Sequence, residues 1–226
     1  MHLLTVTLSA LLLALGACGS TAASESETAG AQPSPAPATT AAPGEDLAVA
    51  YFAGGCFWCT EASFERLEGV QAVVSGYSGG PEVDPTYQEV ANGRTGHAET
   101  VAVYYDSAAI DYPTLLEVFF VAHDPTTLNR QGPDRGPQYR SAVFYGNPAE
   151  ERLARAAIAR LDASGAYGAP AVTEVTAFET FYPAEDYHQG YYELNPTNPY
   201  IVNVSRPKVR KVEKRFADLL KERYRS

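Results

Sequence analysis

The segment GGCFWC, residues 54–59, places two cysteines three residues apart directly after a pair of glycines. An apolar stretch typical of a strand precedes it and a helical pattern follows, so we expect Cys56 at the first turn of a helix. The N-terminus of a helix offers free N–H groups and a partial positive charge, which favour a thiolate over a thiol. The spacing also brings the sulfur of Cys59 within reach of that of Cys56. The pattern therefore predicts a reactive thiol with a second thiol beside it.

A cysteine pair with this spacing has other interpretations. It can form half of a zinc site, and a cysteine can also be a buried structural residue. Structural zinc needs four nitrogen or sulfur ligands, and no other cysteine follows residue 46, so His97, His123 and His188 would have to supply the rest. A redox pair needs no further ligand, and we predict that no metal is bound.

A candidate acid lies in a later predicted strand. His97 and Glu99 alternate to the same face of that strand. A glutamate shielded from water has a raised pKa and keeps its proton near neutral pH. The plain alternative is that both side chains face solvent.

Phenol groups supply a third kind of chemistry. Tyr77, Tyr87 and Tyr139 lie in predicted loops, and Asp134 lies near the last of them in sequence. A phenol in a pocket is a neutral hydrogen-bond donor that does not titrate at working pH. We treat these residues as candidates for binding a polar group of a substrate. Most of the 15 tyrosines in the chain are expected in packing or surface positions.

The elements that must position these residues alternate between strands and helices. The pattern predicts strands over residues 47–54, 70–80, 97–106, 140–147 and 170–178, and helices over 56–69, 112–123, 148–165, 184–195 and 207–224. Residues 86–96 predict a loop or one short helix, and residues 124–138 predict a long loop with little regular structure, which is typical of functional segments. The order predicts an α+β fold, a split βαβ (ferredoxin-like) plait with extra helices and long functional loops.

The first 46 residues read as a targeting segment and a tether. Residues 1–17 contain an apolar run that is too short for a membrane span and predicts a signal peptide, although the leader has no Lys or Arg. Residues 15–18, LGAC, resemble the lipobox of bacterial lipoproteins, which implies a lipid on Cys18; the alternative is an ordinary cleaved signal with an incidental cysteine. Residues 18–46 are rich in Ala, Ser, Thr, Pro and Glu, which predicts a disordered linker. Residues 47–226 form the predicted catalytic domain.

The net charge of −10 argues against a general nucleic-acid role, because phosphate binding needs a basic surface. The C-terminal residues 206–225 are basic in spite of this, and we interpret them as a solvated helix face rather than a partner-binding patch. We expect a monomer.

The motifs together resemble those of peptide methionine sulfoxide reductases of type A over residues 47–222. The matching segments are GGCFWC, GYSGG, PTYQEV, TGHAETV, FFVAHDPTTLNRQG, QYRSAVFY and FYPAEDYHQGYY. The resemblance implies that Cys56 is the nucleophile, that Phe57 and Trp58 form the apolar walls for the substrate methyl group, and that Glu99 protonates the sulfoxide oxygen. It implies further that Tyr87 and Tyr139 hydrogen-bond this oxygen, that Asp134 supports the pocket, and that His188 belongs to a substrate-binding signature.

The second thiol is where this chain departs from much of the family. Many members have glycine at the position of Cys59 and use cysteines near the C-terminus, which this chain lacks. We therefore predict that a Cys56 sulfenic acid condenses with Cys59 to a disulfide, which thioredoxin or a thioredoxin-like protein reduces, with no bound cofactor. Direct attack of an external thiol on the sulfenic acid is the alternative.

The function predicted from this resemblance is thiol-dependent reduction of methionine-S-sulfoxide, free or in oxidised proteins and peptides. The leader places it outside the cytoplasm, as a lipoprotein of the bacterial cell membrane or outer membrane. Three rival functions fit the residues less well. A thioredoxin-type oxidoreductase leaves Glu99 and the tyrosines unexplained, a zinc deaminase has its HxE before its cysteine pair, and a non-catalytic lipoprotein would not need Cys56.

Overall fold

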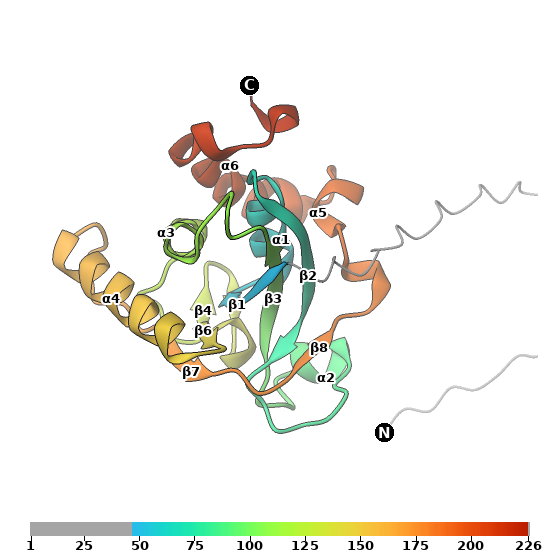
Figure 1. Cartoon of the computed structure of the whole chain (residues 1–226). Helices are drawn as coiled ribbons and strands as arrows, with labels where there is room; N and C mark the ends of the chain where they lie inside the picture. Colours follow the sequence, from blue (N-terminus) through green and yellow to red (C-terminus); the bar gives the residue numbers. More distant parts are fainter. Residues whose placement is uncertain (1–46, 226) are drawn as a thin grey trace, which may run out of the picture. The chain divides into compact units, whose positions relative to one another are not determined.

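One sheet of six strands organises residues 47–225, the part of the chain that the computed structural model describes (Figure 1). The expected signal peptide, the lipid-anchor cysteine Cys18 and the linker lie outside the described residues. The strands, in spatial order, are β7 (Glu174–Ala177), β6 (Ser141–Tyr145), β1 (Ala48–Gly54), β3 (Ala98–Tyr105), β2 (Val70–Ser78) and β8 (Phe181–Pro183).

The four inner strands have the order of a split βαβ plait. Strand β1 pairs antiparallel with both β3 and β6, and β2 pairs antiparallel with β3. Helix α1 (Phe57–Glu65) connects β1 to β2, and helix α3 (Tyr112–Ala122) follows β3. The predicted α+β plait is therefore confirmed, with β7 added in parallel to β6 and β8 added antiparallel to β2.

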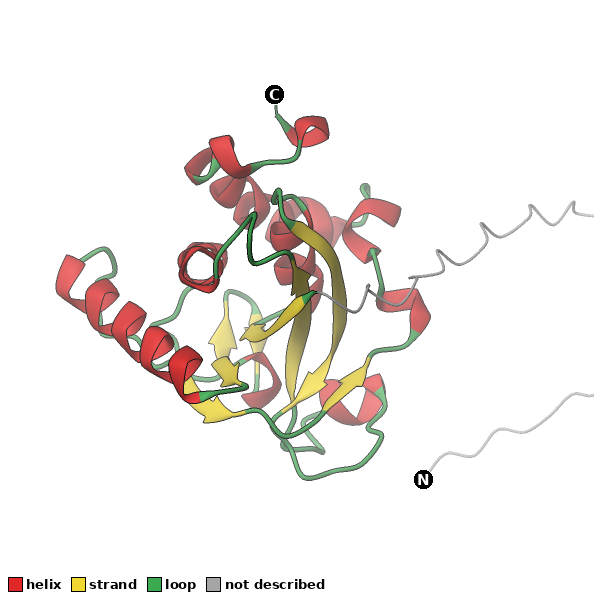
Figure 2. Ribbon diagram, viewed as in Figure 1, coloured by secondary structure: helices red, strands yellow, loops and turns green. Residues whose placement is uncertain are grey.

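The main core lies between the sheet and the helices α1, α3 and α6 (Arg206–Arg215) (Figures 1 and 2). Phe52 at its centre is fully buried and stacks on Phe64 of α1 and Phe119 of α3, with ring centroids 5.3 Å and 5.0 Å away. Side chains of a strand alternate between its two faces. Because Val101 and Val103 point into this core, Glu99 points to the same helix-covered face. It lies at the N-terminal end of β3, next to the start of α1.

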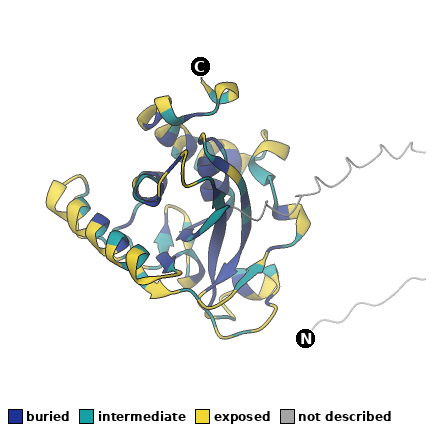
Figure 3. Cartoon of the chain, viewed as in Figure 1, coloured by how far each residue is buried: buried dark blue, intermediate teal, exposed yellow. Residues whose placement is uncertain are grey.

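A smaller apolar cluster covers the opposite face. It contains Ala53, Ala98, Ala142 and Phe144, and Tyr51 beside it stacks on Phe178 at a centroid distance of 3.9 Å. The short side chains let the segment that connects β7 to β8 lie close to the sheet. Helix α4 (Pro148–Ser164) flanks α3 and β6 and exposes most of its outer face to solvent (Figure 3).

The C-terminal part departs from the predicted single helix over residues 207–224. Helix α6 ends at Arg215, and 3₁₀ turns follow at Ala217–Leu219 and Glu222–Tyr224. Backbone pairing with the turn after α1 explains the break, because the Glu68 N–H donates to the Leu219 carbonyl and the Lys221 N–H donates to the Arg66 carbonyl, each at 2.8 Å. These contacts bury Leu220 and override the helical periodicity.

Three further local predictions were incomplete or wrong. The predicted helix over residues 184–195 is a 3₁₀ turn (Asp186–His188) and a short α5 (Tyr191–Leu194), separated at Gly190, whose φ of 63° is left-handed. The predicted loop over residues 124–138 contains a small hairpin of β4 (Arg130–Gln131) and β5 (Asp134–Arg135). Neither β8 nor the π-helix Ile201–Ser205 was predicted.

Of the two alternatives predicted for residues 86–96, a loop or one short helix, the structure has the short helix α2 (Tyr87–Ala91). Within residues 47–225 no helix has both the length and the apolar character that a bilayer span requires.

Candidate active site

A small cavity of about 210 Å³ opens at the N-terminal end of α1. Its wall brings together side chains from the start of α1, from α2, β3, the hairpin β4–β5, the turn after it, and the segment before α6. The lining residues are Cys56, Phe57, Trp58, Tyr87, Glu99, Asp134, Tyr139 and Tyr200. Seven of these eight were proposed from the sequence.

Cys56 occupies the N-cap position of α1 and is 5% exposed. The turn that places it there requires glycine at position 55, where φ is +84° and a Cβ would lie 2.4 Å from the side chain of Gln131. The side chain of Gln131 is itself held by Asp124, whose N–H donates to Gln131 Oε1 at 3.1 Å. The long loop therefore sets the position of the cysteine.

Glu99 lies at the base of the cavity and is 2% exposed. Its Oε2 accepts a hydrogen bond of 3.0 Å from the Phe57 N–H, one of the free N–H groups of the first turn of α1. Burial raises the pKa of Glu99 to about 8, and the negative charge of Asp134 adds to this effect, while the Phe57 N–H opposes it only in part. Glu99 is therefore protonated at neutral pH.

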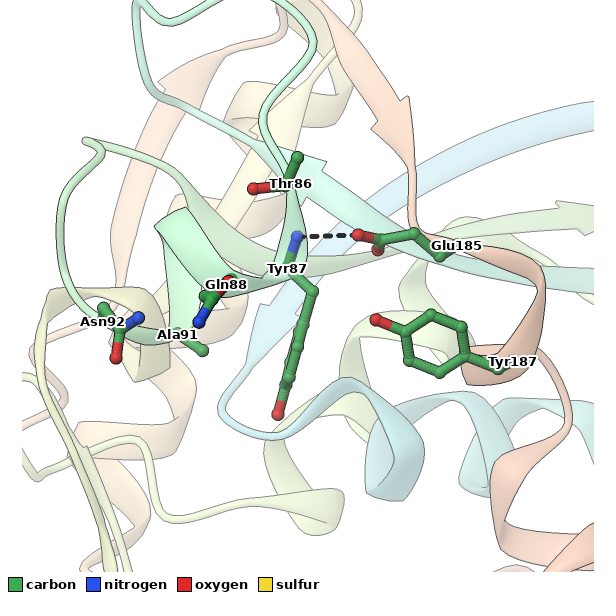
Figure 4. A pocket seen from close by; sticks show the side chains of 7 residues that line it. All are labelled: Thr86, Tyr87, Gln88, Ala91, Asn92, Glu185 and Tyr187. Atoms are coloured by element: carbon green, nitrogen blue, oxygen red, sulfur yellow. Dashed lines mark hydrogen bonds between the residues drawn. The ribbon is translucent and has the colours of Figure 1, made fainter.

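Tyr87 begins α2, and a capping box at Thr86 fixes the start of this helix. The Tyr87 N–H also donates to Glu185 Oε1 at 2.9 Å, so the backbone that carries the phenol is held at two points (Figure 4). Burial raises the pKa of Tyr87 to about 12, and it raises that of Tyr139 as well, so both remain hydrogen-bond donors. Tyr77 does not reach the cavity, because its hydroxyl donates to Glu185 at 2.9 Å.

Tyr200 is the cavity residue that the sequence analysis missed. Its hydroxyl donates a hydrogen bond of 2.5 Å to Asp134 Oδ2 and lies within hydrogen-bonding reach of the Cys56 sulfur. It has helical backbone angles and directly precedes the π-helix, but the sequence around it showed no helical or strand periodicity. The segment that ends at Tyr200, NPTNPY, predicts only a loop.

Cys59 lies behind Cys56 and outside the cavity wall, with 2% exposure. Its sulfur donates a hydrogen bond of 3.2 Å to Ser205 Oγ, and the buried Nζ of Lys208 has no hydrogen-bond partner among the described residues. Both thiols are reduced in the structure.

The two thiols are electrostatically unequal. Burial raises the pKa of Cys56 well above its usual value, and its hydrogen bond with Cys59 raises it further. The pKa of Cys59 is lowered to about 7, chiefly by the hydrogen bond from Cys56, with the positive charge of Lys208 and the Ser205 hydroxyl also outweighing burial. The surroundings therefore oppose ionisation of Cys56 and favour that of Cys59. Burial of Cys56 and the engagement of the first N–H of α1 by Glu99 oppose the effect that the helix N-terminus was expected to have on this thiol.

His188 lies behind the aromatic wall and not in the cavity lining. Its Nδ1 accepts a hydrogen bond of 3.2 Å from Trp58 Nε1, and burial lowers its pKa to about 4, so the ring is neutral. Trp58 is further fixed by stacking on Tyr191 at a centroid distance of 3.9 Å. His188 thus orients the wall, which differs from the substrate contact expected from the sequence.

The other two histidines of this region have structural partners. His97 accepts a hydrogen bond from the Gly80 N–H at 3.3 Å, and its Nε2 lies 2.8 Å from the Glu82 carbonyl oxygen. His123 lies between the Phe119 carbonyl and the Ser141 hydroxyl, at 2.7 Å from each. Within the described range 47–225, no group of three or more His, Cys, Asp or Glu side chains is arranged to hold a metal ion.

The cavity combines a thiol, a neutral carboxylic acid and phenol donors beside an aromatic wall. Hydrogen-bond donors around one point stabilise negative charge on an oxygen atom, and a thiol beside them can attack the atom that carries this oxygen. The aromatic wall suits a small apolar substituent on the same atom. This geometry fits reduction of a sulfoxide.

Comparison with known proteins agrees with the geometry. The family model described as peptide methionine sulfoxide reductase matches residues 48–220. The peptide methionine sulfoxide reductase MsrA of Natronomonas pharaonis is 53% identical over 176 residues, which cover 78% of this chain and 99% of that protein. The enzyme of the same name from Chromobacterium violaceum is 53% identical over 171 residues, covering 76% of this chain and 97% of that protein.

Two solved structures share the fold. Reduced Mxr1 from Saccharomyces cerevisiae superposes with a TM-score of 0.62 and 32% identity, covering 68% of this chain and 88% of that one. Methionine sulfoxide reductase A of Corynebacterium diphtheriae gives a TM-score of 0.61 and 33% identity, covering 68% and 77%. The chain therefore belongs to the peptide methionine sulfoxide reductase family, type A, and is an oxidoreductase that reduces methionine sulfoxide with electrons from thiols.

Proposed function

We propose that the reduction occurs in the small cavity, with Cys56 as the nucleophile toward the sulfoxide sulfur. The observation that carries this proposal is the convergence of Cys56, protonated Glu99 and the phenols of Tyr87 and Tyr139 on one space of about 210 Å³. A sulfoxide sulfur is a poor electrophile while its oxygen holds negative charge. Protonation or strong hydrogen bonding of this oxygen removes that obstacle.

Glu99 supplies the proton and the two phenols hold the oxygen. The Cys56 sulfur attacks as a thiolate, after its own proton has been released to solvent. The sulfoxide oxygen receives the proton of Glu99 and is transferred to the Cys56 sulfur. The sulfur–oxygen bond of the substrate breaks, methionine leaves, and Cys56 becomes a sulfenic acid.

The aromatic wall selects how the sulfoxide lies. Phe57 and Trp58 present an apolar surface to the S-methyl group, while the oxygen points to Glu99 on the other side. A site with fixed places for oxygen and methyl accepts one configuration at sulfur. In keeping with the family resemblance, we assign the S epimer, free or in oxidised proteins, and a role in protein repair.

Cys59 then completes the cycle on the protein side. Its sulfur attacks the Cys56 sulfur, the oxygen leaves as water with the Cys59 proton, and a Cys56–Cys59 disulfide forms. Glu99 regains its proton from solvent. Lys208 and Ser205 stabilise the negative charge that develops on Cys59 as its proton leaves. A protein dithiol of the thioredoxin type returns the pair to the reduced state, and direct reduction of the sulfenic acid by an external thiol is the competing route.

We also propose that the enzyme acts outside the cytoplasm. A short apolar leader, the lipobox-like LGAC at residues 15–18 and a linker rich in Ala, Ser, Thr and Pro support attachment through Cys18 to the cell membrane or the outer membrane of a bacterium. This part of the chain precedes the described residues.

Replacing Glu99 tests the acid. The carboxyl must be protonated to act, so the wild-type kcat/KM falls as pH rises through about 8 and Glu99 ionises. Glu99→Gln keeps a hydrogen-bond donor but has no proton to transfer. We expect kcat/KM to fall by about 10²-fold or more, and the alkaline decline to disappear from a pH–rate profile measured with dithiothreitol.

Glu61 provides a matched control for this profile. It lies on α1, is buried outside the cavity, and burial raises its pKa to about 8 as well. Glu61→Gln should retain the alkaline decline. A Glu99→Gln enzyme that keeps both its rate and the decline would contradict the assignment of Glu99 as the acid.

Replacing Cys59 tests the disulfide route. Cys59→Ser should form about one methionine per protein, because Cys56 still attacks, and then stop when a thioredoxin-type donor is the only reductant. We expect its steady-state rate to fall at least about tenfold, because no disulfide is presented for exchange. Cys56→Ser is the control and forms no methionine even in the first turnover. Repeated turnover of Cys59→Ser with that donor would rule out the resolving role.

The anchor is tested in a bacterium that expresses the full chain. The wild-type protein should sediment with membranes and incorporate a labelled fatty acid, whereas Cys18→Ala should do neither. Fractionation and labelling measure both properties together. An unlabelled, soluble wild-type protein would contradict attachment at Cys18.

A further inference from the structure

A second hollow lies directly beside the catalytic cavity. Its volume is about 540 Å³, and Tyr87 belongs to the walls of both (Figure 4). The other lining residues come from α2, its N-cap and the segment after β8. They are Thr86, Gln88, Ala91, Asn92, Glu185 and Tyr187.

The wall of this hollow is fixed before any ligand arrives. The capping box at Thr86 and the hydrogen bond from the Tyr87 N–H to Glu185 hold the start of α2. Glu185 also accepts the hydroxyl of Tyr77 with its other oxygen. Burial opposes ionisation of Glu185, but these hydrogen bonds outweigh it and lower the pKa. The carboxylate is therefore ionised and already hydrogen-bonded to the Tyr87 N–H and the Tyr77 hydroxyl.

The groups that remain available to a ligand are neutral. Gln88 and Asn92 are exposed and lie four residues apart, on one side of Tyr87 in Figure 4. Tyr187 lies on the other side with 61% of its surface exposed, and its hydroxyl points toward Tyr87. Side-chain amides can both donate to and accept from a peptide backbone, and an exposed aromatic ring offers apolar contact to a neighbouring side chain.

The volumes of the two hollows suit different parts of a polypeptide substrate. At about 210 Å³, the catalytic cavity is smaller than typical pockets for whole ligands, roughly 300–1,000 Å³, and suits one side chain. A methionine sulfoxide within a polypeptide must therefore leave its main chain and its neighbours outside. The adjoining hollow shares the Tyr87 ring with that cavity and has the size to receive them.

We infer that this hollow is a binding site for the polypeptide segment next to the oxidised methionine. The inference rests on the proposed function of the neighbouring cavity. The occupant is a peptide main chain of varied sequence, because the lining contains no cationic side chain and its one carboxylate is already hydrogen-bonded. Recognition therefore favours oxidised polypeptides over small sulfoxides.

The test compares two substrates on the same enzymes. The peptide substrate is a blocked pentapeptide with a central methionine-S-sulfoxide between glycines, and the small substrate is dimethyl sulfoxide, which fills only the catalytic cavity. For Gln88→Ala/Asn92→Ala and for Tyr187→Ala, we expect kcat/KM for the peptide to fall at least about fivefold, the effect of losing roughly one contact. We expect kcat/KM for dimethyl sulfoxide to stay within about twofold of the wild type.

Leu194→Ala is the control for both substrates. Leu194→Ala removes an exposed apolar side chain that lines neither hollow, and it should leave both values unchanged. Variants that reduce the peptide as well as the wild type, or that lose both substrates in parallel, would overturn the peptide site while leaving the catalytic proposal intact. If the wild type reduces neither substrate, the catalytic proposal itself is wrong.

Discussion

The arrangement of the site depends on one hydrogen bond, from the Phe57 N–H at the start of α1 to Glu99 Oε2 on β3. The first turn of a helix has N–H groups that need acceptors, and here a buried carboxyl satisfies one of them. The bond ties the catalytic helix to the sheet and keeps the acid beside Cys56. Because a single N–H only partly offsets burial, Glu99 retains its proton at neutral pH while its position is fixed. A fully ionised carboxylate at this place could not serve as an acid, and an exposed one would not hold a proton.

Burial makes the two thiols unequal. Burial raises the pKa of Cys56, which faces the cavity, whereas Lys208 and Ser205 help to lower that of Cys59, which lies one turn behind it. This division suits a reaction in which one sulfur attacks the substrate and the other then closes a disulfide. It also places the C-terminal segment, which supplies Ser205 and Lys208, in the chemistry of the second step. The departures from helical structure after Arg215 anchor that segment against the turn that follows α1.

Local pattern was sufficient for most of the fold and much of the site. The GGCFWC segment placed Cys56 at a helix start, and strand alternation placed Glu99 on one face, but only the sheet order shows that this face is the one covered by α1. Contacts between distant segments were not accessible in this way. Tyr200 reaches Asp134 from the start of the π-helix, where the sequence showed no periodicity, and His188 supports Trp58 from behind. The position of Cys56 at a helix start was visible in the sequence, while the burial that raises its pKa was not.

The central claim is that the sulfoxide oxygen passes to the sulfur of Cys56 beside a protonated Glu99. The most direct measurement uses a methionine-S-sulfoxide peptide with isotopically labelled oxygen, one equivalent of Cys59→Ser protein and no reductant, followed by mass spectrometry of a sulfenic acid left on the protein. The account predicts one methionine per protein and one labelled oxygen on Cys56. Labelled oxygen on another residue, or methionine formed without oxygen on Cys56, would contradict it.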